Sequence, residues 1–535
     1  MRLNANGLRE RGEWERAGFV LPRFDLEKVK AETRKSPGWI HFGAGNIFRV
    51  FPAARMQKLL DDGIETAGLI VAEGFDYEII DAVFVPHDNL SLAVTLKADG
   101  SIDKTVIASV TEALRADSRH PDFERLREIF RAPGLKMASF TITEKGYLLR
   151  RGPEYAPEVA ADFREGPARP ESYLGKVAAL LYERFRAGRL PLAMCSLDNC
   201  SHNGDRLGEA MAAFAGAWTR AGLAEAGFAG YVGNPAEVSF PWSMIDKITP
   251  RPDEGVRKML LEAGFEDVET AVTAKNTHVA PFVNAEETEY LVIEDSFPNG
   301  RPALDRAGVV FTGRDTVDRV EKMKVGTCLN PLHTALAIFG CLLSFTKISE
   351  EMRDPDLRRL VEKIGYDEGL PVVSDPGIVD PRDFLRQCLE VRFPNPFMPD
   401  TPQRIACDTS QKLPVRFGET IKAYLARPDL EAGKLRLIPL VFAGWCRYLL
   451  GVDDRGAPFE RSPDPLLPAL DKRLAGIRLG DRGSFHEALA PILSDPAIFG
   501  VDLYGAGLGE RVEEAFGEMA AGAGAVRETL RKYLS

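Results

Sequence analysis

The stretch WIHFGAGNIFRV, residues 39–50, decides the fold of this chain. Its first four residues, Trp39 to Phe42, form a short apolar run that is typical of a buried strand, and Gly43-Ala44-Gly45 ends that run. Apolar residues then recur at helical spacing from Ile47 to Leu60, and Gly63 lies just beyond them. We therefore predict a strand, a glycine turn and a helix in this order.

A second apolar run, Ala67–Ala72, is followed at once by Glu73. Strand, glycine turn, helix, strand and acid together open a βαβ unit that binds a dinucleotide. In such a unit Gly43 allows the tight turn and Gly45 lets the backbone approach a pyrophosphate, which the free N–H groups of the helix N-terminus then bind. Glu73 would accept hydrogen bonds from both ribose hydroxyls of the adenosine and would repel a 2′-phosphate. The sequence therefore predicts NAD as cofactor rather than NADP.

Two simpler interpretations of these residues stay open. Phe48 stands where the common fingerprint has its third glycine, and a GxG pair by itself is more often a plain turn than a cofactor loop. Glu73 by itself is more often a solvated acid at a strand end, and Asp76 lies close enough to take its role. The order of the surrounding elements favours the dinucleotide interpretation.

The rest of the chain separates into two halves of different character. Strand-like runs alternate with helical segments in the first half, at residues 92–96, 106–110, 137–142 and 192–197. Longer helical stretches follow the region near Ala285, at residues 332–345, 356–364 and 437–450. Because 535 residues exceed one ordinary core, we predict two domains. They are an α/β Rossmann-type domain over residues 1–285, with an N-terminal arm of about 37 residues, and a mostly α-helical substrate and catalytic domain over residues 286–535.

The composition of the chain excludes several classes of function. A formal net charge of −11 argues against a general affinity for nucleic acid, which needs a cationic surface. Seven cysteines without a CxxC pair are a poor basis for a disulfide framework or a structural zinc site and favour a reducing compartment. No uninterrupted apolar run of about 18 residues occurs, and the charged start lacks the apolar core of a secretory signal. We predict a cytoplasmic protein without a membrane span that acts on a small molecule, as a monomer or a small homo-oligomer.

Polar residues gather where an enzyme would place them, at predicted strand ends and helix starts. These clusters are TITEKGY at 141–147, SLDN at 196–199, SMIDK at 243–247, the segment from Lys324 to His333, and the segment from Arg404 to Lys412.

Together with HFGAGNIFR, FPWSMIDKITP, VIEDSFPNGRP, KVGTCLNPLH and NPFMPDTPQRIACDTSQKLP, these clusters resemble the mannitol dehydrogenase family of long-chain polyol and sugar-acid dehydrogenases, over nearly the whole chain. The resemblance implies an NAD-dependent oxidoreductase that acts on a CH–OH group without a metal. It also implies a Rossmann-type half and a mostly helical half, with the site in the cleft between them.

The resemblance also implies a role for each matching residue. Lys324 would be the general base in oxidation and the acid in reduction, Asn199 and Asn330 would hold the substrate oxygen, and His333 would orient the substrate. Asp246, Arg404 and Lys412 would bind the remaining hydroxyls or a carboxylate. The residues expected to bind the cofactor are Gly43, Gly45, Phe48, Arg49, Glu73, Thr143 and Glu144.

These roles are chemically reasonable without the family. A neutral amine near pH 7–8 can take the proton of a carbinol, provided that burial or nearby positive charge depresses the lysine pKa. Two carboxamide N–H donors would then stabilise the alkoxide in place of zinc, for which no Cys/His/Glu cluster is present. Taken singly, several residues have ordinary explanations: Asn330 before Pro331 suits a helix N-cap, and Lys324 suits a solvated surface. Their joint order and spacing favours the functional interpretation.

One departure from the family concerns the lysine. Members usually place it five residues before the asparagine, whereas Lys324 lies six residues before Asn330. In a straight helix the additional residue would rotate the lysine by about 100°. A π-bulge or a kink near Gly326 or Pro331 would absorb it. Lys322 is the alternative base.

The substrate is less determined than the reaction. KxxxCLNPLHT at 324–334, with Tyr290-Leu291 where many polyol dehydrogenases have Gln-Trp, is more similar to family members that interconvert D-mannonate and D-fructuronate. Arg404 and Lys412 would then share the carboxylate of the substrate. Reduction of tagaturonate and oxidation of mannitol at C2 remain alternatives. A dinucleotide-binding protein without catalysis is disfavoured, because the polar residues of the site are all present.

Overall fold

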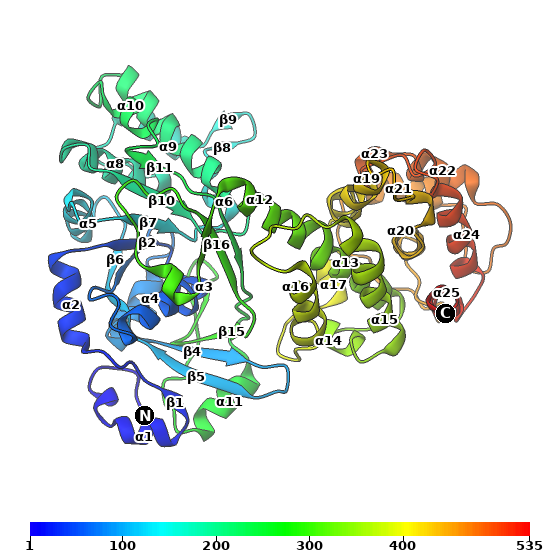
Figure 1. Ribbon diagram of the computed structural model, residues 1–535, viewed down its shortest axis with the longest axis horizontal. Coiled ribbons are helices and arrows are strands. Elements are labelled where there is room, and N and C mark those ends of the chain that lie inside the picture. The colour runs from blue at the N-terminus through cyan, green and yellow to red at the C-terminus, as the bar shows by residue number, and fades with distance from the viewer. The chain divides into compact units, whose positions relative to one another are not determined.

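The computed structural model describes residues 1–535 and divides into two compact units. The first comprises Met1–Lys97 and Ser101–Asp318, and the second comprises Arg319–Ser535 with Ala98–Gly100. The first unit is an α/β fold and the second is almost entirely helical (Figure 1). This confirms the predicted fold class.

A parallel sheet of six strands forms the centre of the first unit, in the order β11-β10-β7-β2-β3-β6. Its strands are β2 (Trp39–Phe42), β3 (Leu69–Glu73), β6 (Val110–Arg115), β7 (Met137–Phe140), β10 (Leu192–Ser196) and β11 (Val238–Ser239). Strand order runs outward in opposite directions from β2 and β7. Their carboxyl ends are therefore the switch point at which doubly wound sheets bind ligands.

Alternate residues of these strands enter two different cores. Ile40 and Phe42 pack into one hydrophobic cluster, whereas Trp39 and Val71 pack into the other. Helices cover both faces of the sheet (Figure 1). The first cluster takes residues from α5 (Asp122–Arg131), α8 (Tyr173–Arg186) and α9 (Asn203–Arg220), and the second from α3 (Asn46–Val50) and α4 (Pro52–Asp61).

The helix expected over residues 47–60 is broken in two. Pro52 lacks the N–H that would continue the helix, and Phe51 before it has φ −122° and ψ −72°, outside the helical region. The strand run expected over 106–110 likewise spans two strands, because β5 ends at Ile107 and β6 begins at Val110.

The boundary between the units lies at Asp318, well beyond the predicted position near Ala285. Ala285 itself belongs to β15 and pairs with Thr95 of β4. Two further strands then add to a sheet of the first unit, since β16 pairs with β12 and β17 pairs with β16. The strands concerned are β4 (Ser91–Leu96), β12 (Ser243–Asp246), β15 (Phe282–Glu286), β16 (Tyr290–Glu294) and β17 (Val310–Thr312). Residues 286–318 are therefore part of the α/β unit rather than of the helical one.

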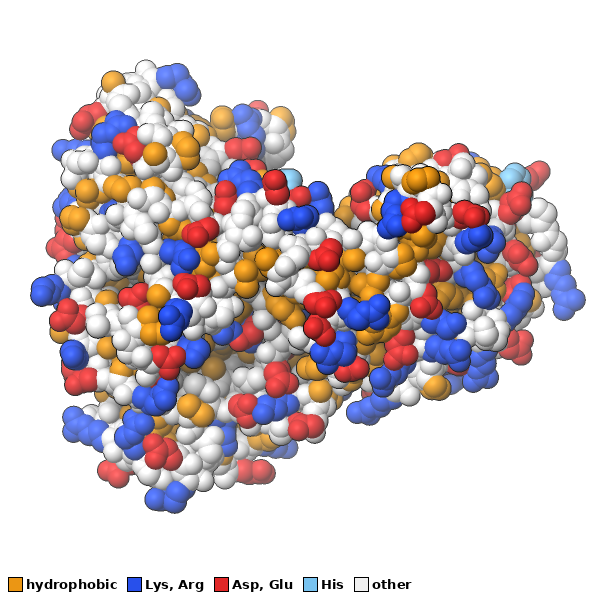
Figure 2. Space-filling view, viewed as in Figure 1, with side chains coloured by type: hydrophobic (Ala, Val, Ile, Leu, Met, Phe, Trp, Pro, Cys, Tyr) orange, Lys and Arg blue, Asp and Glu red, His pale blue; other side chains and the backbone are white.

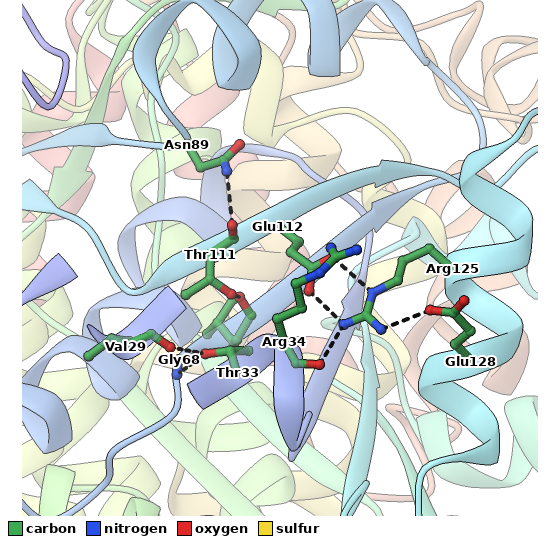
Figure 3. Close-up of polar contacts among 10 residues, drawn as sticks. Val29, Thr33, Arg34, Gly68, Asn89, Thr111, Glu112, Arg125 and Glu128 are labelled. Carbon is green, nitrogen blue, oxygen red and sulfur yellow. Dashed lines mark hydrogen bonds and ion pairs between the residues drawn. The ribbon is translucent and has the colours of Figure 1, made fainter. Parts of the chain in front are cut away.

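The N-terminal arm is folded rather than extended. It contributes a short helix, a strand that pairs with β5, and helix α2 beside the edge strand β6. Figure 3 shows how these elements are joined: the Thr33 hydroxyl accepts from Gly68 N at 2.7 Å, and Arg125 forms an ion pair with Glu112 at 2.8 Å while donating to the Arg34 carbonyl. These elements are α1 (Arg11–Arg16), β1 (Phe19–Val20), α2 (Leu26–Lys35) and β5 (Ile102–Ile107). A helix and a partly buried charge pair thus protect the β6 edge of the sheet.

Smaller elements complete the first unit. They are α6 (Thr143–Gly146), α7 (Pro157–Glu165), α10 (Phe228–Val232), α11 (Glu254–Glu262), β8 (Arg150–Arg151), β9 (Glu154–Tyr155), β13 (Ala271–Val272) and β14 (His278–Val279).

Two almost entirely apolar helices, α13 (Asn330–Leu342) and α20 (Leu437–Tyr448), pack together in the second unit, and every residue of α20 is buried. The other helices are α12 (Arg314–Met323), which crosses the division, and α14 (Ile348–Glu351), α15 (Pro355–Lys363), α16 (Pro381–Gln387), α17 (Pro402–Ile405), α18 (Thr409–Leu413), α19 (Glu419–Leu425), α21 (Leu467–Leu474), α22 (His486–Leu493), α23 (Pro496–Phe499), α24 (Gly509–Ala520) and α25 (Ala525–Leu534).

The helical run Arg314–Leu342 has 29 residues and meets the length and composition of a membrane-crossing helix. In this protein 78% of its most apolar window is buried. Core helices of globular proteins pass the same test, so the run by itself is weak evidence for a membrane span.

Charged side chains of both signs are interspersed over the face drawn in Figure 2. Lys and Arg do not gather there into an extended cationic surface of the kind that nucleic acid requires.

Glu351 is a buried acid without a hydrogen-bond partner. Its side chain is fully enclosed at the end of α14, and neither carboxyl oxygen has a partner. The carboxyl packs against Gly340 of α13, where a Cβ would collide with it. Burial, with smaller contributions from Asp354 and Glu350, raises the pKa of Glu351 well above its usual value. The folded protein therefore binds a proton at Glu351 that the unfolded chain releases.

We expect Glu351→Gln to become increasingly more stable than the natural protein as pH rises from 5 to 8. The raised folded-state pKa makes the natural protein lose stability as pH rises above the unfolded value, whereas glutamine does not titrate. The growth should be on the order of 1–3 kcal/mol, comparable with the cost of a buried polar group without a partner. Thermal unfolding of both proteins across this pH range measures it, and a pH-independent difference would contradict a protonated Glu351.

Candidate active site

A cavity of about 680 Å³ lies at the carboxyl ends of the central strands of the first unit. Gly43, Gly45, Glu73 and Thr143, four of the predicted cofactor residues, line it together. The other lining residues are Gly74, Phe75, Asp76, Ile79, Thr141, Ile142, Lys145, Gly146, Leu148, Leu149, Glu158, Val159, Glu171, Ser172, Tyr173, Leu174, Lys176 and Thr277. Apolar walls with a few polar groups are typical of a small-molecule site.

The glycine turn needs both of its glycines, for different reasons. Gly43 has φ +105°, and a Cβ there would collide with the carbonyl oxygen of Thr141 at the end of the neighbouring strand. Gly45 precedes the first turn of α3 and faces open space. The first glycine therefore allows two strand ends to approach, and the second leaves room for a ligand beside the helix N-terminus.

A buried histidine, His41, supports the glycine turn. His41 lies within hydrogen-bond distance of Ser139 Oγ at 2.7 Å and of Thr141 Oγ1 at 2.8 Å. Burial lowers its pKa to about 3, so the ring is neutral at pH 7. Because Thr141 lines the cavity and His41 does not, His41 orients a cavity residue from outside the cavity. Sequence reasoning missed this link, which joins residues that are far apart in the chain.

Two of the predicted cofactor residues lie beneath the turn instead of in the cavity. Phe48 is fully buried and stacks on His41 with ring centroids 4.3 Å apart. Arg49 is also buried, and its guanidinium donates to Ser91 Oγ and to the Pro281 carbonyl, both at 2.9 Å. These contacts commit both side chains to packing, so neither is placed to touch a cofactor.

Glu73 joins the second strand to the glycine turn. One of its oxygens accepts from Ala44 N at 2.8 Å, and the other accepts from Phe75 N at 2.8 Å and Asp76 N at 3.0 Å. Asp76, the alternative acid, accepts from the hydroxyls of Thr273 and Thr277. Glu73 stays the better candidate for the ribose, because one of its oxygens binds the turn that would hold the pyrophosphate, whereas Asp76 is bound by two threonine hydroxyls.

The TITEKGY segment forms a strained turn on the other side of the cavity. Thr143 has φ +64°, which is unfavourable for a β-branched residue. Asp198 holds the turn by accepting from the backbone N–H groups of Ile142 and Thr143, both at 2.9 Å, and from the Tyr147 hydroxyl at 2.6 Å. Glu144 points elsewhere, since it forms an exposed ion pair with Arg206 and does not line the cavity.

The same aspartate fixes the loop that carries Asn199. Asn203 donates to the Asp198 carbonyl and to the Ser243 carbonyl, both at 3.0 Å, and accepts from Ser243 N at 3.0 Å. The loop with Asn199 is thereby joined to β12, at whose end Asp246 is buried. Sequence analysis did not assign Asn203 this connecting role.

Lys324 opens a π-helical turn, Lys324–Cys328, in the second unit. Leu329 N donates to the Lys324 carbonyl at 3.1 Å, five residues back, and α13 then begins at Asn330. This confirms the predicted π-bulge, which absorbs the additional residue between lysine and asparagine. Lys324 is 4% exposed, whereas Lys322 is exposed, so the burial expected of a general base favours Lys324.

His333 lies one turn into α13 among charged groups. Its Nε2 is 3.5 Å from Asp400 Oδ2, and its ring lies 5.3 Å from that of Phe393. Burial lowers the pKa of His333 to about 4; Asp400 opposes the shift, and nearby arginines, Arg416 first, add to it. His333 is therefore neutral at pH 7 and can both donate and accept a hydrogen bond.

The two cations expected at the substrate are already engaged. Arg404 forms an ion pair with Asp400, and Lys412 donates to the carbonyls of Ile405 and Cys407. Burial, with the charge of Arg416, lowers the pKa of Lys412. Within the second unit Lys324, Asn330 and His333 thus follow one another along one helix, with Arg404 joined to them through Asp400.

A doubly wound sheet with a glycine turn, an acid at the end of the second strand and a cavity at the switch point defines a Rossmann-type dinucleotide-binding unit. The chain belongs to the mannitol dehydrogenase family. Residues 37–306 match the mannitol dehydrogenase Rossmann domain, and residues 316–519 match the mannitol dehydrogenase C-terminal domain. The resemblance seen in the sequence is therefore confirmed.

The chain is 55% identical to D-mannonate oxidoreductase of Thermotoga maritima over 100% of its own length and 99% of that protein. It is 31% identical to mannitol 2-dehydrogenase of Cereibacter sphaeroides, over 82% of this chain and 86% of that protein. Among solved structures, the ternary complex of Pseudomonas fluorescens mannitol 2-dehydrogenase with NAD and D-mannitol is 26% identical, with a TM-score of 0.68 over 99% of each chain. A substrate-free D-sorbitol dehydrogenase has the same fold, with a TM-score of 0.78 at 24% identity over 94% of this chain and 97% of that one.

Asp198→Asn should weaken NADH binding about tenfold and lower the melting temperature. An amide cannot accept from Ile142 N, Thr143 N and the Tyr147 hydroxyl together, so the turn beside the cavity loses at least one hydrogen bond. Quenching of tryptophan fluorescence by NADH measures the affinity. Asp295→Asn, which changes an exposed carboxylate paired with Arg301, is the matched control and should leave both quantities unchanged. Unaltered NADH affinity in Asp198→Asn would show that the turn does not depend on Asp198.

Proposed function

We propose that this protein is an NAD-dependent, metal-independent dehydrogenase that interconverts D-mannonate and D-fructuronate by hydride transfer. The observation that carries the proposal is the 55% identity with D-mannonate oxidoreductase of Thermotoga maritima over both full lengths. Mannitol 2-dehydrogenases are much more distant, at about 31% identity and below. Tagaturonate reduction and mannitol oxidation are the competing activities.

The cavity of the first unit fits the adenosine and pyrophosphate of NAD. Gly43 and Gly45 would admit the pyrophosphate beside the N-terminus of α3, and Glu73 would accept from the ribose hydroxyls. Four acids and two lysines line the cavity, which disfavours a 2′-phosphate; they are Glu73, Asp76, Glu158, Glu171, Lys145 and Lys176. Bound NAD supplies the nicotinamide carbon that accepts the hydride.

The proton chemistry is assigned to residues of this chain. Lys324 would take the hydroxyl proton of the substrate during oxidation and return it during reduction. The amides of Asn199 and Asn330 would donate to the same oxygen while negative charge develops on it. Neutral His333 would hold a neighbouring hydroxyl, and Asp246 would accept from another. No metal takes part in this scheme.

We also propose a cellular location and an assembly state. All seven cysteines are free thiols, which suits the reducing cytoplasm. The site needs only the small substrate and the cofactor, so we propose a monomer or a small homo-oligomer without nucleic-acid or membrane partners.

Fructuronate should be reduced with a kcat/KM at least about tenfold above those for tagaturonate and fructose. The rate of loss of NADH absorbance with each ketose measures the order, and added EDTA should leave the rates unchanged. A faster reaction with tagaturonate or fructose would move the assignment to the corresponding activity. Binding of NADH without any turnover would support the non-catalytic alternative, and recovery of EDTA-treated enzyme by divalent ions would contradict a metal-free mechanism.

Lys324→Ala should reduce kcat with fructuronate by about 10²- to 10⁴-fold, the usual contribution of a general acid or base. NADH affinity should persist, because the cavity for the cofactor belongs to the other unit. Lys322→Ala is the matched control, two residues away and exposed, and should retain most of the activity. If Lys322→Ala were the inactive variant, the catalytic role would pass to Lys322.

A further inference from the structure

Hydrogen bonds from only one of its nitrogens hold Arg416 beside the first turn of α13. It lies in the π-helical turn Pro414–Gly418, and its Nη1 donates to Thr334 Oγ1 at 2.6 Å and, more weakly, to the Asn330 carbonyl at 3.4 Å. Thr334 in turn donates to the Asn330 carbonyl at 2.9 Å. The guanidinium is thereby fixed next to Asn330, and its positive charge contributes to the lowered pKa of His333.

The remaining donors of Arg416 are not used by the protein. Nε and Nη2 donate to no protein acceptor, and neither belongs to the polar atoms that are sealed from solvent without a partner. Two of the other buried arginines differ in this respect. Arg184 and Arg447 each use Nε, Nη1 and Nη2 to bind backbone carbonyls. In those two arginines every guanidinium nitrogen is hydrogen-bonded to the protein. In Arg416 the edge formed by Nε and Nη2 remains available to a ligand, and we call it the open edge.

Arg416 also lacks a counter-ion. Burial alone lowers its pKa to about 10, with no opposing contribution from a carboxylate. Asp400, the acid nearest to His333, is already paired with Arg404, and Lys412 is engaged by carbonyl groups. A largely buried guanidinium without a partner is costly to the folded protein, and an anion placed on its open edge would relieve that cost.

We infer that Arg416 binds the carboxylate of the sugar acid through Nε and Nη2 and so determines the preference for an acid over a neutral polyol. The inference rests on the proposed function. It identifies the residue that would recognise the carboxylate of the substrate. The parallel N–H donors of a guanidinium edge match the two oxygens of a carboxylate. A neutral ketose would leave this cation unpaired, so the same contact both attracts the acid and rejects the polyol. Arg404 and Lys412 then serve to hold the surrounding backbone and Asp400.

The test compares the KM for fructuronate, kcat and the NADH dissociation constant in Arg416→Met and in the natural enzyme. We expect the KM to rise at least about 30-fold, because the charge-assisted pair is lost, while NADH affinity stays within about twofold. Arg416→Lys keeps the charge but not the fork, so a smaller rise of about tenfold is expected. It also serves if the methionine variant does not fold. The matched control is Arg427→Met, which removes an exposed arginine paired with Asp429 and should change none of the three quantities.

The outcomes separate this inference from the proposed function. If the natural enzyme does not reduce fructuronate at all, the proposed function fails before Arg416 is tested. If it does, and folded Arg416→Met keeps its KM within about threefold, Arg416 does not bind the carboxylate. A parallel loss of kcat and NADH affinity at unchanged KM would likewise overturn the inference, because it would mark Arg416 as a purely structural residue. Partial rescue of Arg416→Met by added guanidinium, seen as a fall in the KM for fructuronate, would support it.

Discussion

The contact between Gly43 and the Thr141 carbonyl is the constraint on which the first unit depends. A side chain at position 43 would force the ends of β2 and β7 apart, at the point where the strand order of the sheet reverses. Glu73 closes the third side by binding Ala44 N, so that three strand ends meet around one turn. The cavity that receives the cofactor exists because these ends are locked, and the ligand needs only to fill a site that is already formed.

Much of the fold followed from local patterns, and the errors have physical causes. The strands around the glycine turn were predictable because each is a short apolar run bounded by turn residues. The helix over 47–60 was predicted as continuous, since its apolar spacing outweighed the effect of Pro52. The domain boundary was placed too early, because residues 286–318 contain two short strands, β16 and β17, and β16 pairs with β12, 44 to 50 residues back in the chain. No local pattern identifies a strand by a partner that lies 44 to 50 residues away.

Those features of the site that follow from the spacing of residues along a helix could be predicted from the sequence. The additional residue between Lys324 and Asn330 required an irregular turn, and a π-helical turn is present. By contrast, Phe48 and Arg49 belong to a cofactor motif in sequence but point into the protein, since a helix turns successive residues in different directions. The networks through His41 and Asn203 join residues about 40 to 100 positions apart, so only the folded chain reveals them.

Two π-helical turns pack against each other in the second unit, and this pairing explains why the proposed base and the proposed anion anchor lie together. A π-turn interrupts the regular hydrogen-bond ladder and leaves backbone groups to be satisfied from elsewhere. Thr420, just after the turn of Arg416, donates to the Gly326 carbonyl in the turn of Lys324, and Arg416 donates to Thr334 in the helix that follows. Each irregular turn is thus stabilised by the segment that carries the other functional residue. A substitution that straightened either helix would move the lysine and the arginine relative to each other. The two π-helical turns therefore fix the position of the proposed base relative to the proposed anion site.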